Sequence, residues 1–89
     1  MANPVSGTFS DTGQSSVIVG RKIDVAMDFA GTATVTVERQ MPNGSWITHA
    51  SKTADYSDTL SFAANTAVRL NCTAHTDNVV YLLATGPEG

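Results

Sequence analysis

Strict alternation of apolar and polar residues is the feature of this sequence that most restricts its fold. From Ile23 to Phe29 every second residue is large and apolar, and Asp or Ala fills the positions between. Residues 33–38 repeat the pattern with Thr and Glu between Ala33, Val35 and Val37. A period of two is that of a half-buried β-strand, and no stretch has the apolar spacing of an amphipathic helix. The sequence therefore predicts an all-β protein.

Turn signals between the alternating segments predict antiparallel hairpins. Ala30-Gly31 separates the two segments just described, so residues 22–40 are predicted to form one hairpin. Pro42-Asn43-Gly44 predicts a second hairpin, which continues into residues 45–50, because Asn-Gly tolerates the positive φ of tight turns. The other predicted elements are a loop over 51–57, strands over 59–63, 68–74 and 79–84, turns at 65–66 and 76–78, and weaker strands near 5–10 and 15–19. The strands over 68–74 and 79–84 are expected to pair as a third hairpin.

A chain of 89 residues has room for one hydrophobic core, so residues 1–89 are expected to form a single domain. Its seven or eight predicted strands suggest a small antiparallel β-sandwich or a compact jelly roll. Residues 1–4 and 86–89 are expected to be flexible. Cys72 is the only cysteine, so the domain has no internal disulfide to stabilise it.

The charge balance argues against two classes of partner. Five Lys and Arg residues against eight Asp and Glu residues give a net charge of −3, which does not suit nucleic acid or an anionic membrane surface. No apolar run approaches the ~18 residues of a membrane-spanning helix, and residues 1–10 lack the features of a secretory signal. We therefore expect no nucleic-acid partner and no membrane association.

The sequence carries no pattern typical of catalysis or metal binding. His49 and His75 have no cysteine or carboxylate at metal-ligand spacing, and no Gly-x-Ser-x-Gly motif is present. Cys72 shares the inward parity of Val68 and Leu70, which predicts a buried thiol instead of a nucleophile. The aspartates at positions 24, 28, 55 and 58 are interpreted as solvated surface groups, with calcium binding as the alternative. We expect no enzymatic activity, no metal and no cofactor.

Two segments are apolar at both parities. Residues 79–83 and 17–19 carry apolar side chains on consecutive positions, whereas an antiparallel strand with one solvated face normally alternates. With Tyr81 and Leu83 pointing inward, Val80 and Leu82 would form a second apolar face, together with Ile18. We predict that these three residues contact another protein; the alternative is a strand covered by the chain's own loops.

Trp46 and Ile47 follow the Asn-Gly turn and form a second candidate contact. A tryptophan beside a hairpin turn can anchor a protein interface or stack on a sugar. The alternative, which is the more common arrangement, is that Trp46 caps one end of the core.

The chain resembles small virion and prophage proteins of tailed bacteriophages. The resemblance is carried by Val37-Glu38-Arg39, by Asn43-Gly44-Ser45-Trp46, by residues 68–74 and by Val80-Tyr81-Leu82, and it spans about residues 17–84. It implies a β-sandwich of the head-decoration or minor structural type, which binds other virion proteins in repeated copies. It implies no catalytic residues. Residues 51–57 are shorter than the corresponding segment of longer relatives, which favours a compact cementing role over receptor contact.

These observations predict a non-enzymatic capsid decoration protein of a bacteriophage. It would be assembled in the host bacterial cytoplasm and located in the virion. It would form a homo-oligomer, with a trimer favoured. Its partner would be a major capsid protein or another virion protein, on which it would dock. The alternative is a carbohydrate- or receptor-binding module of a phage fibre, tail or baseplate, in which Trp46, Tyr56 and Tyr81 supply stacking surfaces.

Overall fold

The computed structural model describes residues 5–85, which form seven β-strands and no helix. The strands are β1 (Val5–Phe9), β2 (Gly13–Gln14), β3 (Ile18–Phe29), β4 (Ala33–Gln40), β5 (Trp46–Lys52), β6 (Tyr56–His75) and β7 (Val79–Thr85). The all-β prediction is confirmed. The expected flexibility of residues 1–4 and 86–89 concerns segments that lie outside the described residues. Within the described chain no helix is suited to crossing a membrane.

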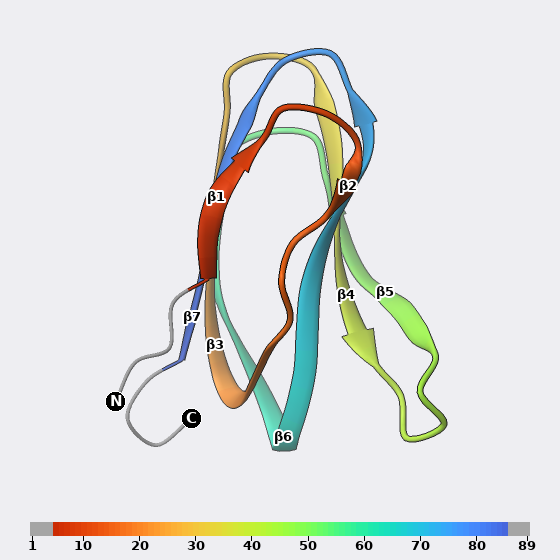
Figure 1. The fold of residues 1–89 in the computed structure, drawn as a ribbon. Helices are drawn as coiled ribbons and strands as arrows, with labels where there is room; N and C mark the ends of the chain where they lie inside the picture. The colour runs from red at the N-terminus through yellow and green to blue at the C-terminus, as the bar shows by residue number, and fades with distance from the viewer. Residues whose placement is uncertain (1–4, 86–89) are drawn as a thin grey trace.

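All seven strands belong to one antiparallel sheet, in the order β1-β7-β3-β6-β4-β5, with β2 added beside β6. The 20-residue strand β6 links the two parts of this sheet, because its first residues pair with β3 and its last residues pair with β4. We call the part with β1, β7, β3 and the start of β6 the β3 half, and the part with β2, the end of β6, β4 and β5 the β4 half. Figure 1 shows the two halves on opposite sides of the molecule, with β6 passing from one to the other. The sheet is continuous, so the sandwich or jelly roll is not confirmed.

The hydrophobic core lies between the two halves and takes alternate residues from their strands. Val25 and Leu83 are neighbours in the β3 half, Val35 and Leu70 come from the β4 half, and all four have 0% of their surface exposed. A single flat sheet leaves both faces open to water, so this degree of burial requires that the halves cover each other. Alternation in the sequence therefore identified the buried face correctly.

Two of the three predicted hairpins are wrong, because their turns connect the two halves. Strand β3 pairs with β6 and β7 but not with β4, and β7 pairs with β1 and β3. The two connections lie side by side, since the Ala30 N–H donates to the carbonyl of Asn78 (2.9 Å) and the Thr76 N–H donates to the carbonyl of Thr32 (3.1 Å). These contacts satisfy backbone groups that a hairpin would have paired with its own neighbouring strand.

The hairpin predicted at Pro42-Asn43-Gly44 is confirmed as the β4–β5 pair. Gly44 has a φ of 90°, which the asparagine-glycine signal anticipates. The Met41 N–H donates to the carbonyl of Ser45 (2.7 Å) and closes the turn.

The middle of the chain is more extended than predicted. Asn65-Thr66 does not separate two strands: β6 is one strand over Tyr56–His75, and Thr66 pairs with Gly20 of β3. The strand does change direction near this point, where it passes from one half to the other (Figure 1). The predicted loop over residues 51–57 shortens to the three residues between the end of β5 and the start of β6. A long strand that serves both halves replaces the two short strands expected from the sequence.

Ile18 is a core residue with 1% of its surface exposed, so its prediction as an interface residue is wrong. The register of β3 against β6 shifts between Gly20 and Lys22, and this bulge reverses which parity faces inward. Ile18 therefore points into the core with Ile23, while Val17 and Val19 are 46% and 54% exposed.

Gly31 offers a test of the two connections between the halves. A Cβ at this position would overlap the carboxylate of Asp77, which accepts a hydrogen bond from the Thr32 N–H (2.8 Å). We expect Gly31→Ala to lower the free energy of unfolding by about 1–2 kcal/mol, because the carboxylate must move and this hydrogen bond is lost. Urea unfolding measures the change.

A double-mutant cycle isolates the contact. Asp77→Ala removes the group that the new methyl group meets, so Gly31→Ala is expected to cost less in the Asp77→Ala background than in the wild type. Strictly additive effects would show that Gly31 is required for a reason other than the approach of Asp77.

Candidate docking surfaces

The outward side of the β3 half carries an apolar patch at the position that the sequence indicated. Val80 and Leu82 of β7 alternate with the buried Val79 and Leu83, and Val80 is 53% exposed. Leu82 lies beside Ala26 of β3 in the sheet. We call Ala26, Val80 and Leu82 the outer patch. Val80 and Leu82 are thus brought together on one surface.

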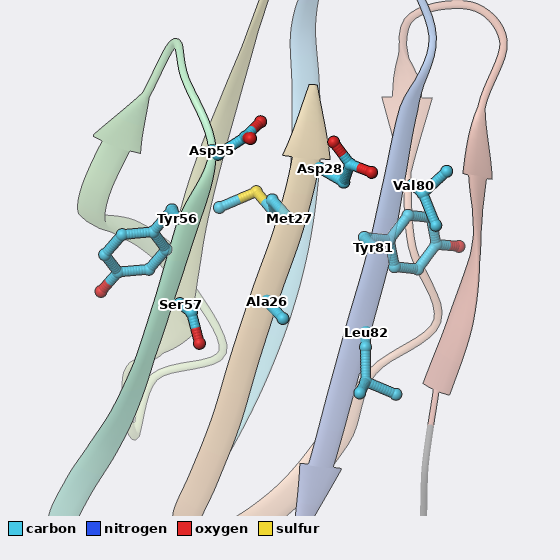
Figure 2. Close-up of a pocket in the computed structure, with 9 residues that line it drawn as sticks. All are labelled: Ala26, Met27, Asp28, Asp55, Tyr56, Ser57, Val80, Tyr81 and Leu82. Atoms are coloured by element: carbon cyan, nitrogen blue, oxygen red, sulfur yellow. The ribbon is translucent and has the colours of Figure 1, made fainter. Parts of the chain in front are cut away.

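A hollow of about 420 Å³ opens around the outer patch. It extends over β6, β3 and β7, and Figure 2 shows the side chains that surround it. Asp28 and Asp55 are its acidic residues, and Asp55 Oδ1 is held in place by the N–H of Phe29 (2.8 Å). The hollow thus combines an apolar floor with a negative rim.

The two tyrosines beside this hollow are already engaged by their own chain. The ring of Tyr81 stacks on Phe9 with the ring centres 4.6 Å apart, and Lys52 Nζ lies 4.2 Å from the centre of the Tyr56 ring. Burial raises the pKa of Tyr56, and the nearby carboxylate of Asp58 raises it further. Tyr56 is therefore protonated at neutral pH and donates to Asp58 Oδ2 (3.3 Å).

Trp46 and Ile47 do not belong to the outer patch. They begin β5 in the β4 half, where Ile47 is 45% exposed and Trp46 is half-buried. Trp46 is not one of the described side chains that pack against the core, so its interpretation as a core cap is wrong. The guanidinium carbon of Arg69 lies 4.3 Å from the centre of its ring instead.

Arg69 is the centre of a polar network on the outward side of the β4 half. Its Nε donates to Glu38 Oε1 at 2.8 Å, and the two side chains are 19% and 13% exposed. Asn71 Nδ2 donates to the other oxygen of Glu38 (3.2 Å), and Arg69 Nη1 donates to Gln14 (3.4 Å). The network thus ties β2, β6, β4 and β5 together across the sheet.

The thiol of Cys72 is buried, as its parity predicted. The residue is 1% exposed, and its S–H donates to the carbonyl of Ala74 (3.5 Å). Burial raises the pKa of Cys72, so the thiol form prevails at neutral pH. This environment is that of a core residue and does not suit a nucleophile.

The histidines and carboxylates of residues 5–85 are spread over the described chain and form no metal-type cluster. His75 Nε2 lies 3.2 Å from Asn78 Oδ1, beside the connection to β7. Across these residues no three His, Cys, Asp or Glu side chains gather as they would around a metal ion.

A second concavity, of about 760 Å³, has no counterpart in the sequence-based predictions. Its wall includes Val19, Arg39, Met41 and Phe62, which come from three separate parts of the chain. Of the residues in its wall, Val19 belongs to a segment that the sequence analysis noted as apolar at both parities.

Comparison with known protein families, with curated proteins and with solved structures finds no match to this chain.

Proposed function

We propose that the protein is a non-enzymatic structural component of a bacteriophage virion, and more specifically a capsid decoration or cementing protein that acts through protein–protein contacts. The observation that carries this proposal is the outer patch, where Val80 and Leu82 point away from a core that is already complete. The sequence resemblance to small virion proteins supplies the class of partner.

The β3 half offers a surface that suits such a contact. Its outward residues beside the outer patch are mostly small or hydroxylated, and the charged residues of β3 are Arg21, Lys22, Asp24 and Asp28. The molecule measures 35 × 28 × 17 Å, so a broad face of this kind is comparable with the roughly 800 Å² that each partner contributes to a standard interface. Apolar residues within a polar surround are typical of interface centres.

A decoration protein binds a capsid as many identical copies, which increases the total strength of binding. Many copies on a symmetric lattice multiply contacts that are individually modest, and an oligomer, with a trimer favoured, would present several outer patches at once. Light scattering over a dilution series measures the oligomeric state. A stable multiple of 9.3 kDa would support a symmetric decoration unit.

Leu82→Asp tests the proposed docking directly. The substitution places a carboxylate in the outer patch without entering the core, so we expect a folded protein whose association with the capsid or with other copies is weakened about a hundredfold or more. Co-sedimentation with particles that lack the protein measures binding, and circular dichroism checks the fold.

Ser51→Asp is the matched control for this experiment. Ser51 is exposed on β5 of the β4 half, so the variant adds the same charge away from the outer patch and should bind as the wild type does. Particles that carry Leu82→Asp at the wild-type level would refute the docking role of the outer patch.

The carbohydrate-binding alternative has less support. Each ring proposed for sugar stacking has one face occupied, Trp46 by Arg69, Tyr56 by Lys52 and Tyr81 by Phe9. Because Trp46 is the only tryptophan, quenching of its fluorescence by a glycan would favour this alternative.

A further inference from the structure

The hollow around the outer patch is acidic at one end. Asp28, Asp55 and Ser57 are the polar residues among the nine that line it, and the other six are apolar or aromatic. Figure 2 shows both carboxylates at one end of the hollow and Leu82 at the other. No Lys, Arg or His lines it. The hollow therefore has a charge preference as well as an apolar floor.

Asp28 and Asp55 occupy facing positions on neighbouring segments. Met27 of β3 pairs with Tyr56 of β6 in an antiparallel ladder, so the residue after Met27 is opposite the residue before Tyr56. The hydrogen bond from the Phe29 N–H to Asp55 Oδ1 (2.8 Å) holds the second carboxylate in this position. Like charges at directly opposed positions destabilise a sheet. A cation that reached both carboxylates would remove this repulsion.

The described chain supplies no cation to this pair of carboxylates. The one ion pair within residues 5–85 lies in the β4 half, between Arg69 and Glu38. Lys52 lies over the ring of Tyr56, with its Nζ 4.2 Å from the ring centre. Both carboxylates are exposed, so a cation of another molecule can reach them.

The rest of the hollow favours a partner that is apolar beside its cation. Val80 is 53% exposed, and the half-buried Ala26 and Leu82 are paired beside it. The volume of about 420 Å³ is within the range of about 300–1,000 Å³ that is typical of small-ligand sites, so side chains of a partner can enter. Apolar residues at the centre of a contact, with charged groups at its rim, are typical of protein interfaces.

Arginine meets both requirements better than lysine does. Its planar guanidinium carries five N–H donors in a fixed arrangement, so it can donate to two carboxylates at once. It is less strongly hydrated than an ammonium group, which lowers the cost of placing it beside apolar side chains. Arginine is also enriched at protein interfaces, whereas lysine is depleted there.

A second copy of the described chain suits the hollow less well. Three of its cations, Arg39, Lys52 and Arg69, already lie over aromatic rings of their own chain. Arg21 and Lys22 are exposed, but they belong to β3, in the half that carries the hollow. Copies joined in a ring through these two residues would fill one another's hollows and leave none for a capsid lattice.

We propose, on the basis of the proposed docking on another virion protein, that the hollow receives an arginine of that partner together with an adjoining apolar side chain. The guanidinium donates to Asp28 and Asp55, and the apolar side chain contacts Val80 and Leu82. The acidic end thereby selects the partner surface, because a neutral or acidic surface would leave two facing carboxylates unpaired.

Peptide binding followed by NMR tests this proposal on the full chain without any capsid. The probe is a short threonine peptide with Leu-Arg-Leu at its centre, and the matched peptides carry lysine or citrulline, the neutral isostere of arginine, in the central position. We expect the arginine peptide to bind about tenfold more tightly than the citrulline peptide, with the lysine peptide between them. The backbone amide signals that shift should be those of residues 26–28, 55–57 and 80–82.

Asp28→Asn and Asp24→Asn are a matched pair of variants for this measurement. Both aspartates are exposed on the outward side of β3, but only Asp28 lines the hollow. Asp28→Asn should remove most of the preference for arginine over citrulline, whereas Asp24→Asn should bind as the wild type does. Asp55→Asn should act like Asp28→Asn, and its retained Oδ1 can still accept from the Phe29 N–H.

Equal binding of the three peptides, or equal losses in Asp28→Asn and Asp24→Asn, would overturn the proposal. Signal changes confined to residues that do not line the hollow would also overturn it. An oligomer that Lys22→Gln and Asp28→Asn both dissociate would assign the hollow to a second copy instead.

Co-sedimentation with particles that lack the protein separates this proposal from the capsid role. We expect Asp28→Asn to bind the particles about tenfold more weakly than Asp24→Asn does. Particle binding that Leu82→Asp abolishes but Asp28→Asn leaves unchanged would keep the capsid role and refute the arginine contact. A wild type that fails to bind particles, yet binds the arginine peptide in the hollow, would refute the capsid role and keep the arginine site.

Discussion

Leu83→Ala is expected to lower the free energy of unfolding by about 3 kcal/mol, while Leu82→Ala, one residue earlier, costs less than about 1 kcal/mol. Leu83 has 0% of its surface exposed and lies between Val5 of β1 and Val25 of β3. Truncating it removes buried methyl groups and leaves a cavity in a core that has only 14 buried apolar residues among residues 5–85. Leu82 faces outward, so its truncation removes little from the core.

Urea unfolding of the two variants at equal protein concentration measures this contrast. The experiment should be done at a protein concentration at which light scattering gives the same mass for both variants. Otherwise an oligomer contact at Leu82 would add to the apparent stability of the variant that keeps this residue. Equal losses for the two variants would contradict the assigned faces of β7, and with them the outer patch.

Arg69→Ala is expected to lower the free energy of unfolding by about 2 kcal/mol and to shift the emission of Trp46 to longer wavelength. The variant leaves Glu38, which is mostly buried, without its cation, and a charge that has lost its partner is costly. It also uncovers the ring face on which the guanidinium lies, so more water reaches the indole. Chemical denaturation and tryptophan fluorescence follow the two effects in one experiment.

Lys52→Ala serves as the control for Arg69→Ala. Lys52 covers the ring of Tyr56 in the same manner, but it has no ion pair among the described residues, and we expect a loss within about 0.5 kcal/mol. An unchanged Trp46 emission in Arg69→Ala would mean that the stacked arrangement does not persist in solution.

Alternation in the sequence was sufficient to predict the strands and the buried face of most of them. Val25, Val37 and Leu70 are fully buried as their parity requires. The outward direction of Val80 and Leu82 followed from the same reasoning, because only one parity of β7 can face the core. These predictions succeeded because they depend on neighbours within one strand.

Strand pairing was predictable only where a turn itself determines it. The positive φ of Gly44 commits the chain to a tight hairpin between β4 and β5. At Ala30-Gly31 and at Thr76-Asp77-Asn78 the same kinds of residue instead connect the two halves of the sheet. A short polar segment does not specify whether the next strand returns beside the previous one or crosses to the facing half.

Ile18 and the second concavity show why two further features were not predicted. At one irregularity Arg21 of β3 and residues 62–65 of β6 have no partner, which reverses the inward parity of β3, and nothing in the alternation reveals where such a shift occurs. The second concavity combines Val19, Arg39 and Phe62, which are neighbours only after β6 has brought the halves together. A site assembled from distant segments can be predicted only when the pairing of the strands is known. That pairing was the least predictable part of this fold.

The pairing of β1 with β7 has a consequence for how the protein folds during synthesis. Val5 is held against Leu83, so the first of the described strands to be synthesised can pair only after the last of them has been made. The β4–β5 hairpin is the one local unit that can form early, and every other pairing closes a long loop. We expect refolding on the slow timescale of milliseconds to seconds that is typical of such topologies.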